Sequence, residues 1–184
     1  MDRRSCRTFL PDAVSDETVL SLIRAAIQAP SPLNGQPWKF TVITNAEKKG
    51  LIADEAARYK DDLIAKSNWK WLMKYDLSML RTTPVMIVVN GDPSKSGADT
   101  IMEGAGLAWR ETCGAAIENL MVAATGRGLA TLWFTMFDRK NIKGIIGTGG
   151  DATVPLAIIL LGKPAEGMKS PPRKSPEEVA TFIR

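Results

Sequence analysis

The sequence predicts a single domain, residues 1–184, of the α/β or α+β class. Segments with the apolar spacing of helices alternate along the chain with short runs of aliphatic and β-branched residues that are typical of strands. The chain has 184 residues, a common length for one domain, and 45% of them are hydrophobic, which is enough for a packed core. The predicted strands are apolar on both faces, as in a sheet that helices cover on each side.

The first elements follow from their caps and their apolar patterns. A helix is predicted to begin after Ser15, which is a favourable N-cap and is followed by two acidic residues at the positive end of the helix dipole. Pro30 lies beyond the end of this helix. A strand is predicted over residues 38–44. Asn45 is placed to cap a second helix that runs to Ala57 or beyond.

The remaining elements follow from the same patterns. Residues 59–80 mix charged and aromatic side chains and are predicted to form one or two helices. A helix over 101–125 is so poor in charge that we expect it to be buried in a core or an interface. The other expected elements are a strand over 85–89, a strand over 130–135, a helix over 138–146, a strand over 154–161 and a last helical turn that begins at Ser175.

The composition limits the chemistry that the chain can perform by itself. It contains no histidine and only two cysteines, Cys6 and Cys113. These counts exclude histidine-based catalytic triads, a disulfide framework and a four-cysteine zinc site. Cys113 lies in an apolar helical segment, and we expect it to be a buried small residue rather than a nucleophile. If the protein is an enzyme, a cofactor is therefore expected to supply the reactive group.

Charge and hydropathy favour a cytoplasmic protein with neither a membrane nor a nucleic-acid partner. No apolar run reaches the ~18 residues that a membrane span needs. The charged first residues are not followed by an apolar signal segment. The net charge of +4 comes mostly from interspersed acidic and basic residues, which predicts a solvated surface rather than a nucleic-acid-binding face.

Basic residues concentrate near both ends of the chain. The first cluster consists of Arg3, Arg4, Ser5 and Arg7. The second is the stretch Lys163–Lys174 of a proline-rich tail that is expected to be extended, and it contains Lys169, Arg173 and Lys174. Guanidinium groups match phosphate oxygens bidentately, and a serine adds a neutral donor. A solvated basic terminus is the alternative for the first cluster, and only the fold can bring the two clusters together.

A stiff loop with polar tips precedes the first predicted strand. Its sequence, from Ala29 to Trp38, contains three prolines and the polar residues Ser31, Asn34 and Gln36. Loops that a rigid scaffold holds in place often contact small molecules. The alternative is a structural connector with Trp38 as a core aromatic residue.

Taken in order along the chain, these segments resemble the FMN-dependent nitroreductase family. Members of that family begin with Arg-Arg-Ser-x-Arg-x-Phe, which Arg3–Phe9 matches. They follow the first helix with Ala-Pro-Ser-x-x-Asn-x-Gln-Pro-Trp, which Ala29–Trp38 matches. The resemblance continues through Cys113–Leu120, Gly128–Trp133 and Gly162–Pro164, and so covers nearly the whole chain.

The resemblance implies a three-layer α+β fold, in which helices flank a mostly antiparallel central sheet. It also implies a domain-swapped homodimer with FMN sites at the subunit interface, in which the tail, about 163–184, packs on the partner subunit. The implied contacts with FMN are Arg3, Arg4, Ser5 and Arg7 at the phosphate and ribityl end, Pro30, Ser31, Pro32 and Asn34 from the partner subunit, Thr131, Leu132 and Trp133 beside the isoalloxazine ring, and Arg173 or Lys174 reaching back to the phosphate.

The implied reaction is ping-pong hydride transfer from NAD(P)H, through noncovalently bound FMN, to an electron-poor small molecule such as a nitroaromatic or a quinone. Two alternatives remain. The first is an enzyme of the same fold with another reductive reaction, such as dehalogenation, or with a reaction that consumes the flavin. The second is a flavin-binding protein without turnover. Trp69, Trp71 and Tyr75 either stack on an aromatic substrate or pack within a helix or a lid.

Overall fold

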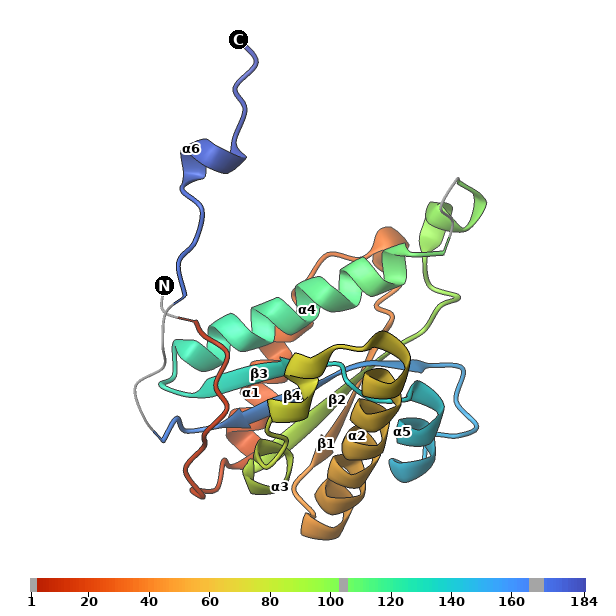
Figure 1. Ribbon diagram of the computed structural model, residues 1–184. Coiled ribbons are helices and arrows are strands. Elements are labelled where there is room, and N and C mark those ends of the chain that lie inside the picture. Colours follow the sequence, from red (N-terminus) through yellow and green to blue (C-terminus); the bar gives the residue numbers. More distant parts are fainter. Residues whose placement is uncertain (1–2, 103–105, 166–170) are drawn as a thin grey trace.

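The computed structural model describes residues 3–102, 106–165 and 171–184 (Figure 1). The α-helices are α1 (Asp16–Ala26), α2 (Ala46–Ser67), α3 (Met79–Thr82), α4 (Ala108–Thr125), α5 (Arg139–Ile145) and α6 (Pro176–Val179). The short 3-10 helices are η1 (Pro32–Asn34), η2 (Lys70–Lys74) and η3 (Gly97–Ile101). The strands are β1 (Trp38–Ile43), β2 (Val85–Gly91), β3 (Ala130–Phe134) and β4 (Val154–Gly162).

The four strands form one sheet in the order β1-β2-β4-β3, and each neighbouring pair is antiparallel. Side chains along a strand point alternately to opposite faces. In β2 this alternation sends Val85, Ile87 and Val89 into one hydrophobic cluster and Met86 and Val88 into another. The central strands are therefore apolar throughout because both of their faces are buried.

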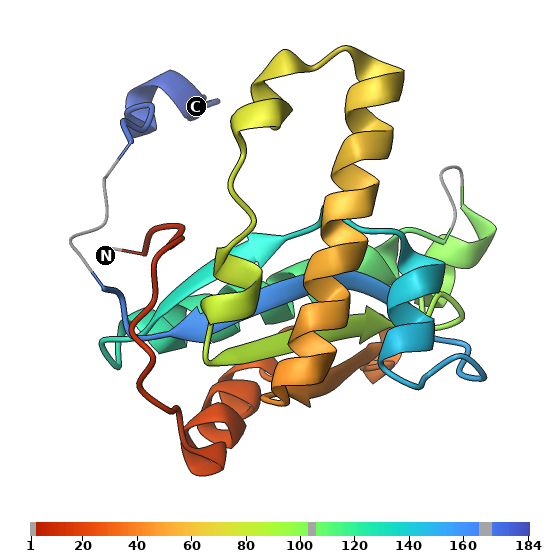
Figure 2. The same cartoon turned by 60° about the horizontal axis from the view of Figure 1, so that its bottom comes forward.

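Helices cover both faces of the sheet and complete three layers (Figure 2). On one face, α1 and α4 pack against each other and bury residues such as Leu22 and Ile117. On the other face, α2, α3 and α5 bury Ile52, Leu80 and Ile142. This arrangement confirms the three-layer α+β fold with a mostly antiparallel sheet that the family resemblance implies.

Most predicted elements are confirmed together with their caps. The Ser15 hydroxyl accepts the backbone N–H of Thr18 at 3.2 Å, and the Asn45 side chain accepts that of Lys48 at 2.9 Å. The strands lie where expected, with the largest difference in β2, which runs to Gly91. The predicted helical segment 59–80 consists of the end of α2, then η2 and the first half of α3.

The predicted helix over 101–125 begins later than expected, at Ala108. Residues 103–105 of the prediction lie outside the described residues. The carboxylate of Asp99, in η3, accepts the backbone N–H groups of Leu107 and Ala108 at 2.6 and 3.0 Å. Gly106 has a φ of +85°, which an α-helix does not allow. The start of α4 is thus fixed by a residue eight or nine positions upstream.

The beginning of the tail is paired with the N-terminal segment. The N–H of Leu10 donates to the carbonyl of Lys163 at 2.9 Å, and that of Ala165 donates to the carbonyl of Thr8 at 3.0 Å. Beyond this pairing, the described part of the tail rises away from the sheet and carries α6 with it (Figure 1). The fold therefore holds the N-terminal segment next to the start of the tail.

A buried carboxylate ties α2 to the start of α5. Glu55 accepts two hydrogen bonds from Arg58, both 2.9 Å long. It also accepts the side-chain N–H of Asn141 at 3.0 Å and the backbone N–H of Asp138 at 3.2 Å. Hydrogen bonds from Arg58 are the largest cause that lowers the pKa of Glu55 below its ordinary value of 4.5.

We expect Glu55 to make folding stability depend on pH in the acidic range. Because its pKa is lower in the folded chain, the unfolded chain takes up this proton first as the pH falls. The stabilisation is therefore complete above 4.5 and is lost as the pH falls through the folded-state pKa. Urea unfolding of Glu55→Gln should show a lower stability than wild type at neutral pH and a smaller loss on acidification. Glu47→Gln, an exposed position on the same helix, is the control and should keep the wild-type slope.

Candidate functional site

The N-terminal basic cluster lies along the outer edge of β3. The N–H of Cys6 donates to the carbonyl of Thr131 at 2.9 Å, and Ser5 forms a parallel bridge with the same residue. The Cys6 side chain is buried and anchors the segment, whereas Ser5 and Arg7 are exposed. Main-chain pairing therefore fixes the segment from which these polar side chains extend.

One arginine of the cluster crosses to α4. The Nε atom of Arg3 lies 2.8 Å from the carboxylate of Glu118, and both side chains are partly exposed. Arg4 donates from a terminal nitrogen to the carbonyl of Arg3 at 2.7 Å. The cluster is therefore attached both to β3 and to the middle of α4.

The proline-rich loop holds unusual backbone conformations. Leu33, Asn34 and Gln36 have φ values of 52°, 53° and 44°, in the left-handed region that non-glycine residues seldom adopt. Hydrogen bonds hold the loop, since the N–H of Gln36 donates to the Ser31 hydroxyl at 3.1 Å. Leu33 is 89% exposed, so its own side-chain packing cannot account for this conformation. Such strain is typical of functional segments.

The loop also packs against η3 at a glycine. Gly97 has a φ of +58°, and a Cβ atom on it would lie 2.6 Å from the Cβ of Pro32. Only glycine meets both conditions without strain. η3 thus supports the loop from the side that leads into α4.

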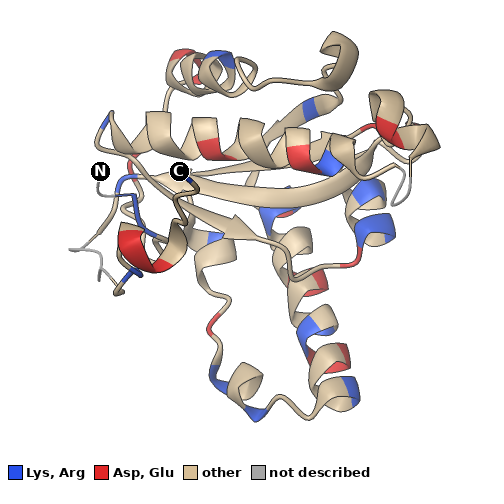
Figure 3. Cartoon of the chain, turned by 90° about the horizontal axis from the view of Figure 1, so that it is seen from above, with Lys and Arg blue, Asp and Glu red and all other residues tan. Residues whose placement is uncertain are grey.

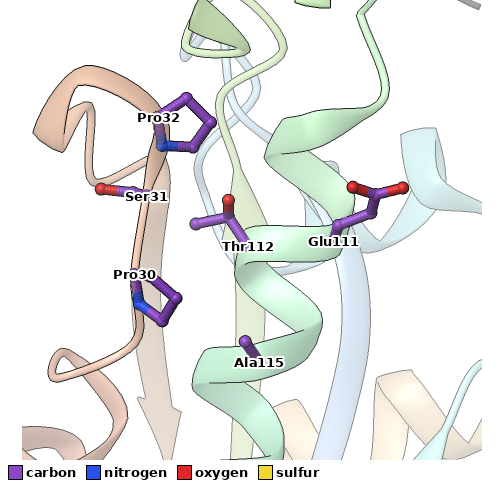
Figure 4. Close-up of a pocket in the computed structure, with 6 residues that line it drawn as sticks. All are labelled: Pro30, Ser31, Pro32, Glu111, Thr112 and Ala115. Carbon is purple, nitrogen blue, oxygen red and sulfur yellow. The ribbon is translucent and has the colours of Figure 1, made fainter. Parts of the chain in front are cut away.

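A pocket of about 390 Å³ separates this loop from α4 (Figure 4). Its lining consists of Pro30, Ser31 and Pro32 from the loop and Glu111, Thr112 and Ala115 from α4. In Figure 4 the Thr112 side chain points toward the loop, whereas the Ser31 hydroxyl and the Glu111 carboxylate point away from the space between the two. The walls of the pocket are therefore largely apolar, and Thr112 contributes a methyl group and a hydroxyl to the lining.

The pocket and the arginine cluster meet the same face of α4. Glu111, Ala115 and Glu118 are four and three residues apart, the spacing of one helix face. At about 1.5 Å per residue, the contact of Arg3 with Glu118 lies about 10 Å along the axis from Glu111. The structure thus brings two of the sequence-predicted groups together along one helix.

The third predicted group consists of Thr131, Leu132 and Trp133 on β3, and only the Trp133 side chain reaches the surface. The Trp133 side chain is 37% exposed, and its ring lies 3.8 Å from the point where a Cβ atom on Gly114 would stand. Thr131 and Leu132 are buried. A ligand at this edge would therefore meet the indole of Trp133 and, from Leu132, backbone atoms only. Asn34, predicted with the loop, is exposed and does not line the pocket.

Arg173 and Lys174 are exposed in the part of the tail that precedes α6. This part leaves the body of the protein (Figure 1). Lys169, predicted with them, lies outside the described residues. Their role at a phosphate thus stays a prediction.

Three further properties of the described residues concern the Cys113 thiol, metal binding and membrane spanning. Burial raises the pKa of the Cys113 thiol to about 12, so the thiol stays protonated and inert at neutral pH. Among residues 3–102, 106–165 and 171–184, no group of three or more cysteine and carboxylate side chains could hold a metal ion. Over the same ranges, no helix is both long enough and apolar enough to cross a membrane.

Sequence reasoning did not single out the residues that α4 contributes. Thr112, Ala115 and Glu118 complete the pocket wall and the contact with Arg3. The available signal was the charge pattern of the helix, since Glu111 and Glu118 lie on one face of an otherwise apolar segment.

Comparison with known proteins is consistent with this geometry. The model of the nitroreductase family matches residues 1–163. A protein from Archaeoglobus fulgidus, provisionally named an NADH dehydrogenase/NAD(P)H nitroreductase, is 28% identical over 168 residues, which cover 89% of this chain and 82% of that protein.

Solved structures share the fold. A BluB-like flavoprotein from Clostridium difficile 630 superimposes with a TM-score of 0.83 at 26% identity, covering 99% of this chain and 95% of that one. An iodotyrosine deiodinase bound to FMN and 3-iodo-L-tyrosine gives a TM-score of 0.80 at 21% identity, covering 99% and 94%. With nine-tenths of its length matched by the family model and these structures alongside, the chain belongs to the nitroreductase family.

Proposed function

We propose that this protein is an FMN-dependent oxidoreductase that uses NAD(P)H to reduce an electron-poor small molecule such as a nitroaromatic or a quinone. The observation that carries the proposal is the common face of α4, along which a phosphate-type donor cluster and an apolar pocket lie about 10 Å apart. The relatives support it, since the similar proteins include an NAD(P)H nitroreductase by name and a flavoprotein.

The donor set suits FMN. A phosphate dianion needs charge-assisted donors, which Arg3, Arg4 and Arg7 supply, with the Ser5 hydroxyl as a neutral donor. A planar ring needs apolar walls with a few directed hydrogen bonds. The proline loop and the Trp133 indole offer such walls, and Thr112 offers a hydroxyl. Arg173 or Lys174 would add a further cation from the tail.

The residues of this chain would bind and orient rather than react. When bound, FMN supplies the hydride chemistry, in a ping-pong reaction with donor and acceptor in turn. The chain contains no histidine, and its two thiols are buried, so these side chains do not offer a general base or a nucleophile. The arginines would fix one end of the cofactor, and the stiff loop would exclude water from the other.

We also propose a homodimer in which each subunit completes the flavin site of the other. The support comes from exposed apolar side chains on the proline-rich loop and at the end of η3, because Leu33, Ile101 and Met102 are 89%, 88% and 62% exposed. Patches of this kind on a folded chain mark interfaces. The projecting α6 segment, with the exposed Phe182 and Ile183 after it, suits packing on a partner subunit.

Cofactor identification tests the proposed function directly. Purified protein mixed with excess FMN and then desalted should retain flavin absorbance and quench flavin fluorescence. Anaerobic NAD(P)H should remove the visible absorbance, and a quinone or nitroaromatic should restore it. A protein that retains no flavin would refute the proposal. Flavin retention without reduction would instead indicate a binding protein, and product analysis under air would reveal a reaction that consumes the flavin.

A further inference from the structure

The N-terminal segment presents two polar side chains on the side of the sheet that carries α4. Ser5 forms a bridge with Thr131, and residues paired in this way point to the same face of a sheet. Thr131 points toward α4, because its neighbours Ala130 and Leu132 belong to the hydrophobic cluster on the opposite face. The Ser5 hydroxyl is therefore on the same side as the Arg3 guanidinium, which contacts Glu118 of α4.

Glu118 is a carboxylate on a rigid support. It lies in the middle of α4, and its helix neighbours Ile117 and Leu120 are completely buried in the core. Its own side chain is partly exposed, so the carboxylate reaches the surface from a helix that the core holds in place. Figure 3 shows acidic positions along α4 and basic positions along the N-terminal segment. Contact with Glu118 thus fixes the Arg3 guanidinium relative to α4.

The contact uses one nitrogen of the Arg3 side chain. The Nε atom lies 2.8 Å from a carboxylate oxygen of Glu118. A guanidinium group has five N–H donors in a planar fork, and most of them are on the two terminal nitrogens rather than on Nε. The Nε contact does not use these terminal donors, but it fixes the plane in which they lie. An arginine whose plane is already fixed loses less rotamer freedom when it binds a second anion.

We propose that Glu118 is a positioning residue for the phosphate site: it holds the Arg3 guanidinium by Nε and so directs the terminal nitrogens to the phosphate of FMN. The inference rests on the proposed function, because the phosphate is that of the proposed cofactor. A carboxylate also repels a phosphate dianion, but solvent and salt screen this repulsion because the Arg3 and Glu118 side chains are both partly exposed. The orientation of Arg3 does not depend on that screening.

A double-mutant cycle of FMN binding, measured by fluorescence titration, tests this role. Arg3→Ala should lower the affinity for FMN about threefold more in the wild-type background than in Glu118→Ala, because Arg3 is less well oriented without its partner. The repulsion between Glu118 and the phosphate is the same with and without Arg3, so it cancels from the comparison. Glu118→Gln keeps an oxygen that can accept the Nε–H of Arg3, and in that background Arg3→Ala should regain most of its wild-type effect.

Two further measurements separate positioning from an effect on the fold. Riboflavin, which lacks the phosphate, should bind to all of these variants with wild-type affinity. In protein with isotopically labelled arginine, the NMR signal of the Arg3 Nε–H is identified by its absence from Arg3→Ala. This proton should be protected from exchange with and without FMN, and it should lose that protection in Glu118→Ala. Glu17→Ala removes an exposed carboxylate from α1 and is the matched control, which should leave FMN binding and the signal unchanged.

The outcomes distinguish this inference from the function on which it rests. If the wild-type protein binds no FMN, the proposed function fails and the positioning role fails with it. If FMN binds but Arg3→Ala has the same effect with and without Glu118, only the positioning role is refuted. A smaller effect of Arg3→Ala in the presence of Glu118, or loss of Nε–H protection when FMN binds, would mean that the carboxylate competes with the phosphate for Arg3. An equal fall in riboflavin binding would assign Glu118 to the fold, and either result overturns the inference.

Discussion

Replacing both Arg3 and Arg4 with alanine should weaken FMN binding about a hundredfold and leave riboflavin binding nearly unchanged. A charge-assisted hydrogen bond to a phosphate contributes about 1.5 kcal/mol or more, and two such losses give about 3 kcal/mol, which is roughly a hundredfold in affinity. Riboflavin lacks the phosphate, so it does not depend on these donors. Fluorescence titration of both flavins, on both proteins, measures the difference.

The control for this variant is Arg24→Ala/Arg127→Ala, which removes two arginines from exposed positions on α1 and after α4. It lowers the net charge by the same amount and should bind FMN as wild type does. Circular dichroism should report an intact fold for both double variants, since the Arg3–Arg4 segment is anchored by Cys6 and its pairing with Thr131. If riboflavin binding falls as far as FMN binding does, the arginines act on the fold rather than on a phosphate.

Local signals were sufficient for most of the fold. The caps at Ser15 and Asn45 and the helical turn at Ser175 were predicted because each side chain serves backbone N–H groups only a few residues away. The sequence shows β2 as a continuous apolar run. Its side chains alternate between the two faces of the sheet, and both faces are buried. Such features depend on neighbours in the sequence, and the sequence therefore predicts them.

Contacts between residues far apart in the sequence determine the parts of the fold and the site that could not be predicted. The start of α4 could not be predicted from its apolar pattern, because the Asp99 carboxylate that caps it belongs to η3. The contact of Arg3 with Glu118 joins residues 115 positions apart, and neither residue alone indicates it. The motifs located the arginine cluster and the proline loop, but only the fold shows that both face α4.

The packing of α4 against the sheet leads to the second large effect, which is expected at Gly91. A Cβ atom at this position would lie 2.4 and 2.6 Å from two ring carbons of Trp109 and 3.0 Å from the sulfur of Cys113. Trp109 and Cys113 are 3% and 0% exposed, so neither can move into solvent. Gly91→Ala should therefore overpack the contact and lower the free energy of unfolding by about 2–3 kcal/mol.

Thermal and urea unfolding measure this loss, which corresponds to a decrease in Tm of roughly 5–10 °C for a chain of this size. Gly149→Ala is the matched control, because a Cβ atom there would have nothing within 4 Å. Adding Trp109→Leu to Gly91→Ala should cost less than the sum of the two single changes, since the smaller side chain makes room for the methyl group. Strict additivity would show that the side chains at positions 91 and 109 are not in steric conflict.

Because Trp109 lies in the first turn of α4, just before Glu111 and Thr112, a displaced ring should also reshape the pocket. Gly91→Ala should therefore weaken FMN binding, and Gly149→Ala should not.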